Sequence, residues 1–167
     1  MHIHTIVAIL QSQKGDNMNK YPIGVTPEAR INLIEKFDLS DAHYIDWEII
    51  VADPSRLQEF IHGYRSNNWS VDEKYALMVI IVASYEEALK KNREEETIWN
   101  EIRSILITDM EIHVETIITW SLKGEEYTQE EIENGDGFLI KKRMIEVYGF
   151  CNIQALVDKD RWNSFDT

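Results

Sequence analysis

The sequence predicts a mainly α-helical fold: a single-domain bundle of about six to eight helices. Two observations lead to this prediction. Helix-start signals recur along the chain, and apolar residues at helical spacing follow each of them. No linker rich in Pro, Gly and Ser interrupts the pattern, so residues 1–167 are expected to fold as one helical domain. Within it, residues 1–25 are expected to be a poorly ordered or strand-like N-terminal segment.

The first two predicted helices begin at Thr26-Pro27 and at Asp53-Pro54. In both, a side-chain oxygen can accept a free backbone N–H, and proline takes the first helical position. The first start is followed by an apolar stripe made of Ile31, Ile34 and Phe37. The second is followed by apolar residues at i, i+3, i+4 and i+7, namely Leu57, Phe60, Ile61 and Tyr64.

The most apolar helix is predicted over residues 71–91, where Ser70-x-x-Glu73 forms a capping box. Only Ser84 is polar between residues 75 and 85, so this helix is expected to be surrounded by others. Two more helices are predicted, over 94–107 and over 109–122, the second capped by Asp109. Their predicted inward residues are Ile98, Trp99, Ile102, Ile105 and Leu106 in the first, and Met110, Val114, Ile117 and Ile118 in the second.

The remaining segments are less regular. Thr128-x-x-Glu131 predicts a short helix, and residues 138–149 and 153–165 predict two more, although residues 145–147 alternate like a strand. Residues 42–51 have two interpretations. Their alternating apolar residues are typical of a strand, which would pair with residues 3–10 in a small two-stranded β-ribbon, while Ser40-Asp41 could instead cap a helix.

The negative charge of the chain is concentrated in one quarter of its length. Residues 94–136 hold thirteen acids against two bases, a net charge of −11 out of −13 for the whole protein. Such a field repels phosphate backbones and attracts basic surfaces, so we expect no direct binding of nucleic acid. The longest apolar stretch, residues 75–83, is too short to span a bilayer, and no base precedes the apolar run at 3–10. With a single cysteine, Cys151, we expect a soluble cytoplasmic protein that binds no membrane.

Few residues suggest chemistry. Glu59-x-x-His62 is the element that di-iron bundles use in pairs, but it occurs once, so it is a weak candidate and no metal or other cofactor is predicted. Asp109 and His113 lie one helical turn apart and could pair, but a capping aspartate with a surface ion pair is the simpler interpretation. No glycine loop for phosphate is present, and no enzymatic activity is expected.

Three hypotheses for function follow. The first is a non-enzymatic domain that docks a basic protein partner through acids on structured helices, most concretely an inhibitor or immunity protein that covers a toxin or nuclease. The second is an adaptor or regulatory subunit that binds through exposed Trp and Tyr residues. The third is a metal-binding helical bundle. The acids expected on the docking face are Glu94, Glu95, Glu96, Glu101, Glu111, Glu115, Glu125, Glu126, Glu130, Glu131 and Asp136.

Overall fold

The computed structural model describes residues 21–41, 46–66, 68–121 and 138–156. Every regular element in these ranges is a helix, which confirms the mainly α-helical fold class. In chain order the elements are α2 (Pro27–Phe37), α3 (Trp47–Ile50), the 3-10 helix η1 (Pro54–Arg56), α4 (Leu57–Ser66), α5 (Val71–Lys90), α6 (Glu96–Thr108), α7 (Met110–Ser121) and α9 (Lys141–Phe150). None of these helices is long and apolar enough to cross a bilayer.

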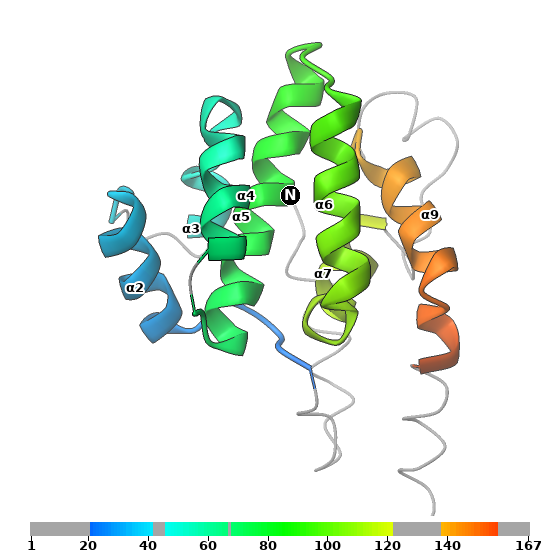
Figure 1. The fold of residues 1–167 in the computed structure, drawn as a ribbon, viewed down its shortest axis with the longest axis horizontal. Helices are drawn as coiled ribbons and strands as arrows, with labels where there is room; N and C mark the ends of the chain where they lie inside the picture. Colours follow the sequence, from blue (N-terminus) through cyan, green and yellow to red (C-terminus); the bar gives the residue numbers. More distant parts are fainter. Residues whose placement is uncertain (1–20, 42–45, 67, 122–137, 157–167) are drawn as a thin grey trace, which may run out of the picture.

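Helix α5 is the centre of the bundle, as its sequence predicts. It contacts α2, α3, α4, α6 and α7, and Figure 1 shows α2 and α9 at opposite edges of the molecule. Every residue from 75 to 86 is buried, so α5 exposes no side of its central turns to solvent. Residues of all the α-helices contribute to one hydrophobic core around it.

The predicted helix starts have the expected cap geometry. The Thr26 hydroxyl accepts the backbone N–H of Ala29 at 3.3 Å, and the Asp53 carboxylate accepts that of Ser55 at 2.9 Å. Ser70 and Glu73 form both hydrogen bonds of the capping box. These local contacts satisfy backbone N–H donors that the start of a helix leaves unpaired. Because each contact lies within one turn, a short sequence motif is enough to predict where the helix begins.

One local prediction is wrong, and two segments with a strand-like pattern are helical. On α2 the buried face is Ala29, Leu33 and Phe37, whereas Ile31 is 55% exposed, because the small Ala29 lies on the face that meets the core. Trp47–Ile50 is helical, so the strand interpretation fails there: Trp47 and Val51, one helical turn apart, are both buried. Residues 145–147 lie inside α9. Residues 3–10 and the predicted helix at 128–131 lie outside the described residues.

A buried carboxylate fixes the position of α9. Glu86, on α5, is 2% exposed, and its two carboxylate oxygens accept the backbone N–H groups of Leu139 and Ile140 at 3.0 and 2.9 Å. These amides precede α9 directly, where a helix leaves donors unpaired and where negative charge is favoured. The central helix therefore caps a helix that begins 55 residues later in the chain.

Gly63 is a point of close approach between α4 and the end of α2. A Cβ atom at this position would lie 2.5 Å from Cζ of Phe37, whose ring packs edge-on against Phe60 and stacks on Trp69. We expect Gly63→Ala to lower the free energy of unfolding by about 1–2 kcal/mol, because overpacking outweighs the gain in helix propensity. Urea denaturation measures this change.

Gly149→Ala is the matched control for Gly63→Ala. Gly149 is also helical, but nothing lies within 4 Å of its added Cβ. This variant is expected to gain up to about 1 kcal/mol of stability from the alanine alone. If both variants were equally stable, close packing of Gly63 on Phe37 would not limit the residue at this position.

Candidate functional site

The predicted acidic residues at the start of α6 are anchored to α9. Glu94 and Glu96 both accept a hydrogen bond from Nη2 of Arg143, at 2.9 Å for Glu96. The Arg143 guanidinium also lies over the ring of Trp99, 5.4 Å from its centroid. The side chains of Glu94 and Glu96 remain 55% and 63% exposed. Two of the acids are therefore held in place by a single cation.

Two further acids are not on an open acidic surface. Glu101 pairs with Arg65 of α4 at 2.5 Å. Glu115 is buried: it accepts a hydrogen bond from the Tyr75 hydroxyl and another, at 3.2 Å, from Thr119. Burial raises the pKa of the Glu115 carboxyl, although these two hydrogen bonds lower it. The expectation that Glu115 lies on a docking face is wrong, because α7 turns this residue toward α5.

The other predicted acids are exposed or undescribed. Glu95 and Glu111 are exposed, and neither forms an ion pair with any residue that the structure describes. They lie beyond opposite ends of α6, a helix of 13 residues and so about 20 Å long. Glu125, Glu126, Glu130, Glu131 and Asp136 fall outside the described residues. The acids that are described thus do not form one continuous face.

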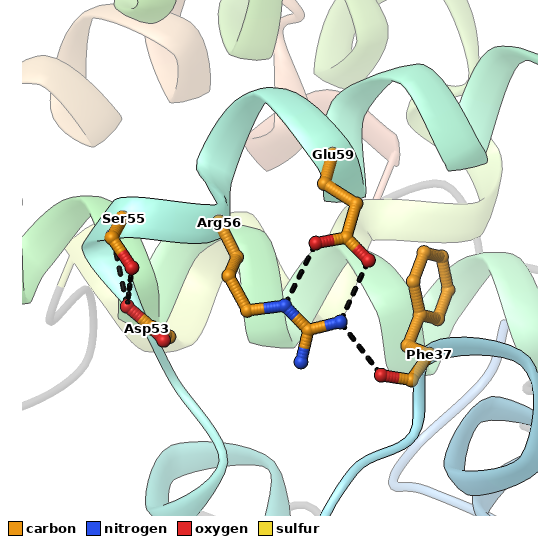
Figure 2. Close-up of polar contacts among 5 residues, drawn as sticks. All are labelled: Phe37, Asp53, Ser55, Arg56 and Glu59. Atoms are coloured by element: carbon orange, nitrogen blue, oxygen red, sulfur yellow. Dashed lines mark hydrogen bonds and ion pairs between the residues drawn. The ribbon is translucent and has the colours of Figure 1, made fainter.

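Glu59 and His62, the weak candidates for metal ligands, form contacts with other side chains. The Arg56 guanidinium donates to both oxygens of Glu59, at 2.8 and 2.6 Å, and to the carbonyl of Phe37 (Figure 2). The hydrogen bond from Arg56 lowers the pKa of Glu59. His62 is exposed, with Nε2 3.1 Å from the Ser66 hydroxyl. Across the described ranges, no three His, Cys, Asp or Glu residues are grouped so as to hold a metal ion.

Asp109 belongs to a polar cluster that joins three helices and the α6–α7 junction. Its Oδ2 accepts the Tyr64 hydroxyl at 2.7 Å and the Lys74 ammonium at 2.9 Å. Nε2 of His113 lies 2.9 Å from the same Tyr64 oxygen. The predicted surface ion pair between Asp109 and His113 is therefore wrong, because His113 is buried and Asp109 pairs with Lys74 instead. Tyr64 and Lys74 come from α4 and α5, which the i, i+4 spacing of Asp109 and His113 could not indicate.

The hydrogen bonds of this cluster run in one direction. Because Tyr64 donates its single hydrogen to Asp109, Nε2 of His113 carries a proton and donates to Tyr64. Nδ1 of His113 has no partner in the described part of the chain, and the side chain is fully buried. Burial lowers the pKa of His113 to about 3, although Asp109 raises it. Burial and the hydrogen bond to Asp109 raise the pKa of Tyr64. A neutral, enclosed imidazole and a tightly held phenolic proton suit a structural cluster better than proton transfer.

Two of the hollows on the surface of the described residues are lined by charged side chains. The first, of about 270 Å³, lies beside this cluster and is lined by Tyr64, Arg65, Lys74, Ser104, Ile105, Thr108 and Asp109. The charged groups that line it are already paired, Lys74 with Asp109 and Arg65 with Glu101. The second, of about 250 Å³, lies where η1, α5 and the start of α6 meet. The second hollow contains Glu95, the acid left unpaired beside Glu94 and Glu96.

Comparison with known proteins adds no relative. No family model matches the chain, and neither a curated protein nor a solved structure is significantly similar to it. The functional argument therefore depends on the charge and geometry of this chain.

Proposed function

We propose that the protein is a non-enzymatic binding domain that docks a basic surface of a partner protein. Its most concrete form is a cytoplasmic inhibitor or immunity protein that covers the basic active site of a toxin or nuclease. The net charge of −11 in residues 94–136 is the observation that carries this proposal. Such a field accelerates encounter with a basic surface and disfavours phosphate-bearing ligands.

The start of α6 is the part of the described structure that best supports docking. Glu94, Glu95 and Glu96 are consecutive and exposed, and Arg143 holds the first and the third in fixed positions. Side chains that are ordered before binding lose less conformational entropy when a partner arrives. The same pairing reduces the negative charge of this surface, because Arg143 neutralises part of the charge of Glu94 and Glu96.

The two other hypotheses receive less support. Trp47, Trp99 and Trp120 are buried in the core, so these large aromatics are not available to a partner, as an adaptor binding through aromatic residues would require. Glu59 is bound by Arg56 in the way Figure 2 shows, so a metal would have to compete with an arginine for its carboxylate. Docking through charge is therefore the function that we carry forward.

Salt dependence tests the proposal. A partner would be cross-linked in the native host, identified and purified, and its affinity measured by calorimetry. Raising the salt from about 50 to about 200 mM is expected to weaken binding at least about tenfold, since screening acts on exposed charges. An affinity that does not respond to salt, or a partner whose contact surface is acidic, would refute docking through charge.

Two charge-matched double variants locate the surface. Glu94→Gln with Glu96→Gln removes two charges at the start of α6, while Glu28→Gln with Glu35→Gln removes two exposed charges from α2. Both leave the same net charge, so they change the distant field equally. We expect a larger loss of affinity from the first pair. Equal losses would place the contact elsewhere.

A further inference from the structure

The hollow at the start of α6 is lined by both apolar and polar residues. Three segments form it: η1 with the first residues of α4, the last turns of α5, and the start of α6. Its lining residues are Pro54, Ser55, Leu57, Gln58, Tyr85, Ala88, Arg93, Glu95 and Ile98. At about 250 Å³ it is smaller than the roughly 300–1,000 Å³ of pockets that hold drug-sized ligands. Its size suits a single side chain.

The polar groups around this hollow are mainly hydrogen-bond acceptors. Glu95 carries a full negative charge and forms no ion pair within the described residues. The Ser55 hydroxyl donates its hydrogen to Asp53 at 2.6 Å, so toward a ligand this oxygen can act only as an acceptor. The amide nitrogen of Gln58 is directed toward Glu101, at 3.5 Å, which leaves the amide oxygen to accept.

Tyr85, which also lines the hollow, carries an unpaired hydroxyl. Its side chain is fully buried and stacks on Trp99, yet its oxygen has no hydrogen-bond partner in the described structure. Burial raises the pKa of the Tyr85 phenol, and Glu95 is among the neighbouring charges that act on it. Since buried hydroxyls are normally paired, a group that enters the hollow and bonds to this oxygen would be favoured.

We propose that this hollow receives an arginine side chain of the basic partner, an inference that rests on the proposed function. The aliphatic stem would pack on Leu57, Ala88 and Ile98, and the guanidinium would donate to Glu95 and to the neutral acceptors. A guanidinium offers five donors in a planar fork, which matches several separated acceptors better than the three donors of lysine. Buried arginine anchors of this kind are typical of binding hot spots.

Arg93 is the one lining residue that opposes such a ligand. It is exposed and carries the same charge as the guanidinium that would bind. Its side chain must therefore turn toward solvent when the hollow is occupied. Removing the charge with Arg93→Gln is expected to strengthen the binding of arginine. If the hollow instead bound a carboxylate, the same substitution would weaken binding.

The experiment uses the full chain without its partner and three small probes. N-acetyl-arginine amide is titrated into the protein and followed by NMR chemical shifts, with the corresponding lysine and norleucine amides as comparisons. Arginine is expected to bind best, and to shift resonances of residues that line the hollow. Equal binding of norleucine or of lysine would overturn the proposal, because then neither charge nor the planar fork decides affinity.

Single substitutions complete the test. Glu95→Gln is expected to weaken arginine binding about fivefold, whereas Glu111→Gln, an exposed acid beyond the far end of α6, should leave it unchanged. Tyr85→Phe should also weaken binding, while thermal stability stays unchanged or rises, since the hydroxyl it removes is unpaired. If Glu95→Gln has no effect, the hollow is not the arginine site. If Glu95→Gln has no effect on arginine binding but the partner complex is still weakened by salt, the arginine site is refuted and the proposed function is not.

Discussion

Replacing Glu86 by alanine is expected to lower the free energy of unfolding by about 3–5 kcal/mol. The variant loses two charge-assisted hydrogen bonds and leaves the amides of Leu139 and Ile140 without an acceptor in a buried environment. Proteins of this kind are stable by only about 5–15 kcal/mol, so the loss would take a large share of the total. Urea denaturation followed by tryptophan fluorescence measures it.

Glu87→Ala is the matched control for this substitution. Glu87 is the next residue on α5, but among the described residues its ion pair is with Lys90 at the surface, where such pairs contribute about 1 kcal/mol or less. Glu86→Gln separates the effect of charge from that of shape, because its amide keeps one acceptor oxygen. The free energy of unfolding of this variant is expected to fall between those of the wild type and Glu86→Ala. Amide hydrogen exchange in α9 should accelerate in the Glu86 variants. Exchange that stays slow, with stability within about 0.5 kcal/mol of wild type, would show that α9 does not depend on this cap.

Acidification from pH 7 to pH 4.5 is expected to remove about 2–3 kcal/mol of stability through His113 alone. Burial lowers the pKa of His113 to about 3, against an ordinary value of about 6.5. Between these values the unfolded chain binds a proton that the folded chain does not, so the free energy of unfolding falls as pH falls. The loss is about 1.4 kcal/mol per pH unit and ends below the folded pKa.

Comparison with His113→Gln isolates this contribution. Burial raises the pKa values of Glu115 and Glu48, so those carboxyls stabilise the fold as pH falls and oppose the effect of His113 in the wild type. Both remain in the variant, and so their effects cancel in the difference. The stability difference between wild type and His113→Gln, measured by urea denaturation, is expected to shift by about 2–3 kcal/mol between the two pH values. A constant difference would mean that His113 titrates normally in the folded state.

Local sequence patterns were sufficient wherever the physical cause is local. Capping motifs such as Ser70-x-x-Glu73 involve backbone groups within one turn, and the buried sets of α4 and α6 follow the helical period. The pattern on α2 misled at Ile31, because an apolar residue is a necessary but not a sufficient sign of burial. The pattern at residues 42–51 left strand and helix open, because alternation over a few residues also fits a single helical turn; residues 47–50 are helical.

The functional residues depended on contacts between distant segments. Counting acids located the charge in residues 94–136, but it could not show that Arg143 holds Glu94 and Glu96, that Arg65 holds Glu101, or that Glu115 is buried against Tyr75. Likewise, the spacing of Asp109 and His113 suggested a pair, whereas the structure inserts the Tyr64 hydroxyl between them.

The sequence by itself determined the helical class, the helix starts, the central position of α5 and the total charge, because each follows from composition or from groups within a few residues of one another. The tertiary structure alone decided which carboxylates stay free, where Glu86 caps α9, and which residues surround the hollow at Glu95. These three features depend on how the helices pack. Packing brings together side chains from distant parts of the chain, and those side chains determine the charge and the hydrogen-bonding groups at the surface that a partner would contact.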